Sequence, residues 1–339
     1  MTRTESHRVN APQYDIVAIG NAIVDVIATA DEAFLQSEEI AKGSMQLISA
    51  ERATDLYSKM GPGREISGGS AANTVAGMAA LGRKCGFIGQ VANDQLGNVF
   101  SHDIKAIDVA FTTPVREGEP PTAQCLILVT PDGQRTMNTF LGASQFLPAA
   151  ALDREMIENA AILYLEGYLW DPEEPRAAMQ SAIRIAREAG RKIAFTLSDT
   201  FCIERHRDSF RALIDNGEID ILFANEGEIH SLMQSDDFDG SVSAVAAKVP
   251  LLVVTRGEQG AIAVKDGVRS EVGAEPIDKV VDTTGAGDLF AAGFLSGHAA
   301  GRSVEDSLTM GAVCAAEVIS HYGPRPEADL KALVAARLG

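Results

Sequence analysis

Residues 282–288 read Asp-Thr-Thr-Gly-Ala-Gly-Asp, and a run of small and apolar residues follows them at 289–299. The two glycines let successive backbone N–H groups converge on one point. A helix predicted over 289–299 adds the positive end of its dipole there, so the loop is suited to binding phosphate. Asp288 falls in the first helical turn, where its carboxylate can accept a proton from an attacking hydroxyl. The alternative is that Asp288 only complements the helix dipole.

A second glycine-rich stretch lies in the first third of the chain, where residues 68–73 read Gly-Gly-Ser-Ala-Ala-Asn. The glycine pair permits a ligand to approach the backbone closely, or it forms a simple turn. Asn73 is a polar residue on a helix of small residues predicted over 71–81. It is either a ligand contact or an internal packing contact.

Asn225 and Glu228 stand at the start of a predicted helix, directly after an apolar run at 219–223. Residues three apart face one side of a helix. Oxygen ligands of this kind suit Mg²⁺, which usually keeps several waters. A solvated helix start is the alternative.

Outside these motifs, short apolar runs alternate with helical patterns. Strands are predicted at 14–19, 162–165, 193–197, 219–223 and 251–255. The alternation predicts an α/β fold, a doubly wound and mostly parallel sheet flanked by helices. Shorter runs at 111–115, 123–130 and 136–140 predict a small antiparallel insertion, a lid on one large domain.

The composition excludes several classes of protein. The chain has 339 residues and a formal net charge of −18, so its surface repels phosphate backbones and no nucleic-acid partner is expected. No apolar run is long enough for a membrane span. The four cysteines are far apart, which favours a reduced, cytoplasmic protein. Residues 1–13 are polar and are expected to form a flexible leader.

The stretch at 282–288 resembles the C-terminal signature of the ribokinase family, the phosphofructokinase-B-type carbohydrate and nucleoside kinases. Residues 68–73 are similar to the N-terminal signature of that family, and residues 225–228 to its Asn-x-x-Glu element. The resemblance implies a ribokinase-like kinase domain with a small β-sheet lid. We expect the domain at 14–324, the lid segments at about 24–48 and 111–142, and a C-terminal helix at 325–339.

The resemblance also implies roles for matching residues. Asp288 would be the catalytic base. The anion hole would be formed by the amides of Gly285, Ala286 and Gly287. Substrate hydroxyls would meet Gly68, Gly69, Ser70 and Asn73. The donor, ATP, would lie on Asn225, Thr255, Gly257, Gly285 and Gly287. Mg²⁺ would be organised through water by Asn225 and Glu228.

Within the family, the chain looks most like the adenosine kinase branch, on residues 20–25 (Gly-Asn-Ala-Ile-Val-Asp), 196–198 and 219–226. In that branch the aspartate matching Asp25 holds the ribose 2′ and 3′ hydroxyls, and the residue matching Asn21 lies beside it. A buried carboxylate that accepts two vicinal hydroxyls also explains an acid within an apolar run. The same device would hold a free sugar.

Four further residues are matched more loosely. Tyr168 offers a stacking face to a purine, or is ordinary core, and Met45 falls where lid residues meet the base. Arg135 resembles a lid arginine that approaches the transferring phosphoryl group, or is an exposed hairpin residue. Asp282 is the nearest match to a monovalent-cation (K⁺) site.

These observations predict an ATP-dependent kinase that phosphorylates the 5′ hydroxyl of a nucleoside, with adenosine as the first candidate. A sugar kinase for ribose or fructose, and a kinase for another purine nucleoside, stay open. A non-catalytic ligand-binding protein on the same fold is the alternative from another class, although a pure binder needs no base at Asp288. Both a monomer and a weak homodimer remain open.

Overall fold

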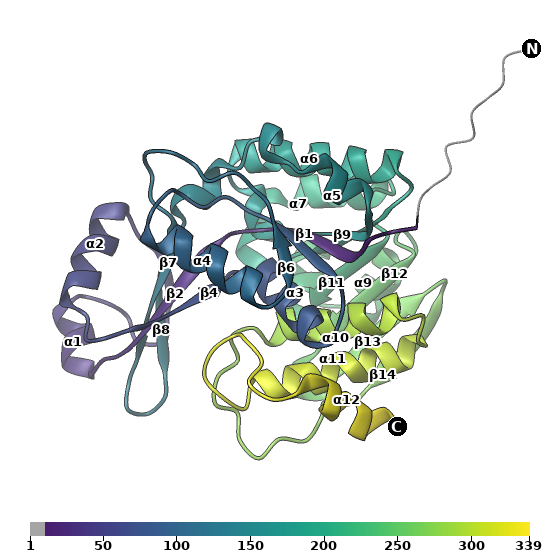
Figure 1. The fold of residues 1–339 in the computed structure, drawn as a ribbon. Coiled ribbons are helices and arrows are strands. Elements are labelled where there is room, and N and C mark those ends of the chain that lie inside the picture. Colours follow the sequence, from purple (N-terminus) through teal and green to yellow (C-terminus); the bar gives the residue numbers. More distant parts are fainter. Residues whose placement is uncertain (1–10) are drawn as a thin grey trace, which may run out of the picture.

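The computed structural model describes residues 11–339, so positions 1–10 of the predicted leader lie outside the described residues. In the described chain, a nine-stranded sheet forms the centre of the body (Figure 1). From edge to edge its strands are β14 (Val268–Val272), β13 (Ala261–Lys265), β12 (Leu251–Thr255), β11 (Ile221–Asn225), β10 (Lys192–Thr196), β9 (Ala160–Glu166), β1 (Tyr14–Ile19), β5 (Cys85–Ile88) and β6 (Val109–Phe111). The strands from β12 to β6 pair in parallel, and β13 and β14 pair antiparallel. The predicted mostly parallel, doubly wound sheet is confirmed.

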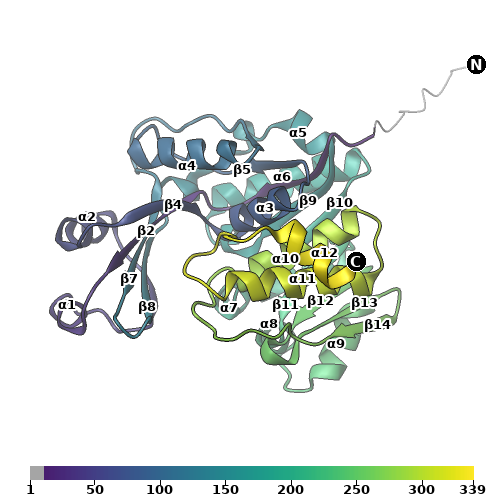
Figure 2. The same ribbon diagram turned by 60° about the horizontal axis from the view of Figure 1, so that its bottom comes forward.

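Helices cover both faces of this sheet (Figure 2). One layer consists of α3 (Ser70–Ala80), α4 (Gln95–Ala106), α10 (Ala286–Ala299), α11 (Val304–Val318) and α12 (Leu330–Leu338). The other consists of α5 (Arg154–Glu158), α6 (Glu173–Glu188), α7 (Thr200–Asp215), α8 (Glu226–Met233) and α9 (Phe238–Ala246). Side chains at residues 16–19 of β1 alternate between the two layers, which is why these four residues are all apolar.

A second, smaller sheet projects from the body, at the left of Figure 1. Its strand order is β3 (Met45–Leu47), β8 (Arg135–Phe140), β7 (Ala123–Val129), β2 (Ile23–Thr29) and β4 (Arg64–Gly68). Two helices, α1 (Glu32–Ser37) and α2 (Ala50–Lys59), pack on one face of this sheet. They close a separate apolar cluster made of Val26, Leu35, Ile40, Leu56, Leu126 and Leu128. We call this unit the lid.

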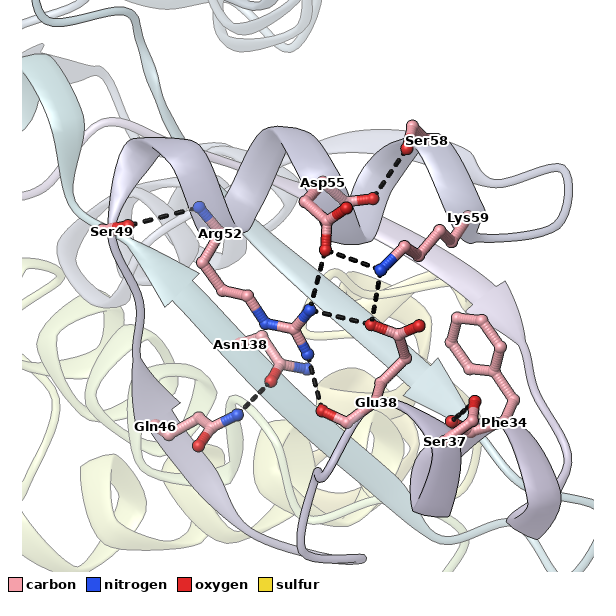
Figure 3. Close-up of polar contacts among 10 residues, drawn as sticks. All are labelled: Phe34, Ser37, Glu38, Gln46, Ser49, Arg52, Asp55, Ser58, Lys59 and Asn138. Atoms are coloured by element: carbon pink, nitrogen blue, oxygen red, sulfur yellow. Dashed lines mark hydrogen bonds and ion pairs between the residues drawn. The ribbon is translucent and has the colours of Figure 1, made fainter.

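Ion pairs fasten the helices of the lid to each other (Figure 3). Arg52 on α2 donates from Nη1 to the Glu38 carboxylate at 2.8 Å and from Nη2 to the Glu38 carbonyl at 2.7 Å. Lys59 reaches the same carboxylate at 3.2 Å and Asp55 at 2.8 Å. Arg52 and Lys59 hold the pKa of Glu38 below its usual range. The two helices α1 and α2 therefore cover one face of the lid sheet.

The lid is larger than the predicted segments 24–48 and 111–142. The sequence prediction omitted β4, because this edge strand carries charged residues and has a weak apolar pattern. The predicted strand at 111–115 is replaced by β6, which belongs to the large sheet. The lid is also mixed rather than antiparallel, since β2 pairs with β7 and β3 with β8 in parallel.

The C-terminal helix predicted at 325–339 begins only at Leu330. Pro326 disfavours helix in the residue before it, and the Asp329 side chain caps the helix that follows. No helix within residues 11–339 is both long and apolar enough to cross a bilayer. Four short 3₁₀ helices complete the described chain: η1 (Gly142–Phe146), η2 (Ala149–Ala151), η3 (Gly167–Trp170) and η4 (Gly257–Gln259).

Candidate active site

A cavity of about 410 Å³ lies where the lid meets the carboxyl ends of the parallel strands. Thr196, Asn225 and Thr255, from the ends of β10, β11 and β12, line it on the body side. Asp25 on β2 lines it from the lid. This edge is where ligands bind in open parallel sheets. We refer to it as the main cavity.

Asp288 lies in this cavity, in the first turn of α10. Ser70 donates to its Oδ1 at 2.6 Å, and the Asn73 side-chain amide donates to its Oδ2 at 2.9 Å. Burial raises the pKa of Asp288, while these two hydrogen bonds favour the ionised form. The structure thus brings together residues that are more than 200 positions apart in the chain. Asn73 Oδ1 is buried without a partner in the described residues, so one acceptor remains for a hydroxyl.

The loop at 282–287, for which the sequence predicts anion binding, directly precedes Asp288 and α10. Gly285 caps α10 with a positive φ of 79°, and residues 283–288 line the main cavity. A side chain at Gly285 would meet Pro324 Cα at 2.9 Å, so conformation and space both require glycine.

Asp25 lies on the lid, 8% exposed, facing the same cavity. Burial raises its pKa to about 7, opposed by the charges of Arg135 and Arg325. Gly68 on β4 lets the carboxylate approach, because a Cβ there would fall 2.6 Å from Asp25 Oδ2. Gly69 has a positive φ of 101° and leads into α3.

Asn21 is fixed by Glu166, a residue to which the sequence analysis gave no role. Glu166 Oε1 accepts from the backbone and side-chain amides of Asn21 at 2.7 and 2.8 Å. Its Oε2 accepts from Ala71 N at 2.7 Å, at the start of α3. Burial raises the pKa of Glu166 to about 7. The sequence feature that could have identified Glu166 is a carboxylate at the end of an otherwise apolar strand.

A second cavity of about 360 Å³ adjoins the first, sharing Ile23, Ser70, Thr139 and Tyr168 in its lining. Its apolar walls include Met45 and Leu47 from β3, and Phe201 from α7. Leu47 is 62% exposed and Phe201 61% exposed, which is unusual for large apolar side chains beside a cavity. Tyr168 and Met45 thus lie together as predicted, whereas Phe201 and Leu47 were missed. We call this space the side cavity.

Asn225 and Glu228 form a capping box at the start of α8. Glu228 N donates to Asn225 Oδ1 at 2.8 Å, and Asn225 Nδ2 donates to Glu228 Oε1 at 2.5 Å. Both residues line the main cavity, and burial raises the pKa of Glu228 to about 7. The oxygen donors suit Mg²⁺, but because they are engaged with each other they fit contact through water better than direct ligation. Thr255 lines the same cavity, while Gly257 starts η4 just beyond it with a φ of 56°.

Arg135 contacts Asp282, the residue that the sequence matches to a monovalent-cation site. Asp282 Oδ1 accepts from Thr284 N and Oγ1, and its Oδ2 accepts from Arg135 Nη1 and from Gly323 N. Both carboxylate oxygens are therefore occupied by donors of the protein, one of them a cation. Arg135 is buried rather than exposed, and its Nε and Nη2 have no partner among the described residues. Two donors remain available beside the anion-binding loop.

The model of the pfkB family of carbohydrate kinases matches residues 14–330. This chain belongs to that family. It is therefore a phosphotransferase that acts on an alcohol group, in a family whose kinases use ATP and typically Mg²⁺.

Its relatives include nucleoside and sugar kinases. The adenosine kinase of Sinorhizobium meliloti is 48% identical, with a TM-score of 0.88 over 96% of this chain and 99% of that one. A probable sugar kinase of Rhizobium etli is 46% identical, with a TM-score of 0.90 over 96% and 99%. The adenosine kinase of Saccharomyces cerevisiae is 25% identical over 91% of this chain and 96% of that protein.

Proposed function

We propose that this kinase transfers the γ-phosphoryl group of ATP to the 5′ hydroxyl of a nucleoside, with adenosine as the first candidate. The observation that carries this proposal is the side cavity beside Asp25. A free sugar would leave that space empty, whereas a purine would bring a flat, largely apolar body to Met45, Leu47 and Phe201. The similarity to the Sinorhizobium meliloti adenosine kinase supports the same assignment.

In this proposal the acceptor bridges lid and body. Its vicinal hydroxyls donate to Asp25, and the unpartnered Asn73 Oδ1 accepts a further hydroxyl proton. Hydrogen bonds to an ionised carboxylate are strong, and they are made in a cavity from which water is largely displaced. The primary hydroxyl then points toward Asp288.

Asp288 accepts the proton of that hydroxyl as the oxygen attacks the γ-phosphorus and the bond to ADP breaks. Ser70 and Asn73 fix both carboxylate oxygens, which orients the base before the substrate arrives. The amides of residues 285–287 and the free donors of Arg135 stabilise charge on the transferring group. Mg²⁺, held through water by Asn225 and Glu228, would neutralise phosphate charge when bound.

A sugar kinase is the second candidate, because one rim of the side cavity is polar. Asp171, Asp199 and Arg205 line that rim, and hydroxyl groups could satisfy them. The similarity to the probable sugar kinase of Rhizobium etli points the same way.

We also propose that the enzyme acts as a monomer built from one kinase domain with its lid. One face of the lid sheet is covered by α1, α2 and the Arg52–Glu38 ion pair, so this face is not free to pair with a second lid. A sedimentation mass of two chains at micromolar concentration would contradict this.

The deciding experiment measures ADP release with Mg·ATP and five acceptors: adenosine, inosine, guanosine, ribose and fructose. Phosphorus NMR of the product then locates the new ester. Adenosine-dependent turnover with a 5′ ester would establish the proposal. Turnover only with a free sugar would keep the kinase mechanism and reject the nucleoside assignment.

A further inference from the structure

Arg325 lies in the loop between α11 and α12, in the sequence Gly-Pro-Arg-Pro at 323–326. No family motif that we identified in the sequence includes this residue. The flanking prolines restrict the backbone on both sides of the arginine, so the loop presents its side chain with little freedom. This segment also contacts the loop at 282–288 directly, because Gly323 N donates to Asp282 at 3.0 Å and Pro324 packs on Gly285.

The guanidinium group of Arg325 binds the turn that connects the lid to α3. Its Nε donates to the Ser67 carbonyl at 3.0 Å, and its Nη2 donates to Ser67 Oγ at 3.2 Å. Its Nη1 donates to the Ala72 carbonyl at 2.9 Å, in the first turn of α3. Ser70 lies between these two acceptor residues in the chain and Asn73 directly follows Ala72, so Arg325 braces the segment whose side chains hold Asp288.

None of the three hydrogen-bond acceptors recorded for Arg325 is a carboxylate. An arginine keeps its positive charge in a protein, so this charge acts on nearby carboxylates without being hydrogen-bonded to one of them. Carboxylates of three other elements face it: Asp25 on β2, Asp288 on α10 and Asp103 on α4. Asp103 also accepts from Ser67 N at 3.1 Å.

Several ionisable groups surround Asp288, and their charges differ in sign. They are Arg325, Asp25 on β2, Glu166 and Tyr164 on β9, and Tyr168 on η3. Among the described residues, Arg325 is the cation whose charge favours the ionised form of Asp288. Arg135, the other nearby cation, acts on Asp25 and is neutralised by Asp282.

We propose that Arg325 is a positioning residue of the phosphoryl transfer, which braces the Ser67–Ala72 turn next to Asp288 and supplies a positive charge near the base. The proposal rests on the proposed role of Asp288 as base. It does not depend on the acceptor, because a nucleoside and a sugar would use the same base. The test therefore uses whichever acceptor the unmodified enzyme phosphorylates.

The test compares Arg325→Gln, Arg325→Lys and the unmodified enzyme in pH profiles of kcat. Arg154→Gln serves as a matched control, because this arginine is 59% exposed and pairs with Glu158 and Glu188 on the surface. The glutamine variant loses the charge, so we expect its acid limb to move upward by about one pH unit. Misplacement of the base should also lower its plateau rate by about 10- to 100-fold.

The lysine variant separates charge from bracing. It keeps a positive charge but cannot reproduce the guanidinium hydrogen bonds to both Ser67 and Ala72. We therefore expect an unshifted acid limb and a lowered plateau rate. An unshifted acid limb in the glutamine variant would overturn the role of the charge. If the lysine variant has the same plateau rate as the unmodified enzyme, the role of bracing is overturned. If the glutamine variant does not fold, the lysine variant alone tests the proposal. Loss of all activity in Asp288→Asn, measured in parallel, distinguishes failure of this proposal from failure of the base assignment.

Discussion

Replacement of Asp288 by asparagine removes the proposed base while preserving its surroundings. Asn73 can still donate to the remaining carbonyl oxygen, and the new amide nitrogen can donate to Ser70 Oγ, because a hydroxyl accepts as well as donates. The variant should therefore fold normally. It should also bind the acceptor as the unmodified enzyme does, since Asp25 and Asn73 Oδ1 are untouched.

The rate should fall by the contribution of a general base, about 10²- to 10⁴-fold. This corresponds to about 2.7–5.4 kcal/mol of lost transition-state stabilisation. Steady-state ADP release would give kcat and KM, and calorimetric titration with the acceptor would give its affinity. Asp239→Asn is the matched control, because that carboxylate is 77% exposed on α9. A kcat within tenfold of the unmodified enzyme would refute the assignment of the base, and a loss confined to KM would make Asp288 a binding residue.

Four further predictions follow from the geometry. Phe201→Ala should raise the KM for a nucleoside by about 10- to 100-fold and leave the KM for ribose unchanged, because the substitution removes only the apolar wall of the side cavity. Steady-state kinetics with both acceptors checks this. The kcat/KM should rise with pH through about 7 as Asp25 ionises. The thermal stability of the free enzyme should fall as the pH rises, because the pKa values of Asp25 and Glu166 are higher in the folded than in the unfolded protein. The stabilisation that these groups give below about pH 4 is lost as the pH rises through about 7. Melting curves recorded from pH 5 to 8 test this direction. Exchange of K⁺ for tetramethylammonium should change turnover less than about twofold, since Arg135 occupies Asp282, and a strict K⁺ requirement would show that this ion pair opens.

The sequence predicts the central sheet well because its strands are buried on both faces and read as continuous apolar runs. It also identifies Asp288, Asn73 and Asp25, whose polar character is at odds with their small or apolar neighbours. The lid is harder to predict. Its edge strand β4 is charged, and its helices cover a small apolar cluster of their own.

Residues that act through tertiary contacts were missed for a different reason. Glu166 and Arg325 make their hydrogen bonds to segments 95 to 258 positions away in the chain, and no local spacing reports such partners. Phe201 appears ordinary in sequence, and only its position on the rim of the side cavity distinguishes it. The Arg135–Asp282 contact joins β8 of the lid to the loop at 282–288, so the partner of neither residue could be predicted from its sequence neighbours.

On the proposed function, the acceptor site is divided between the lid and the body, so the cleft selects acceptors by their length. Asp25 belongs to the lid and Asp288 to the body, so an acceptor is aligned only if its diol and its reactive hydroxyl match the separation between them. A pentose held as a furanose has that separation fixed by its ring, whereas water has no second anchor and cannot span the cleft. On this proposal, discrimination against water as the acceptor depends on the length of the acceptor.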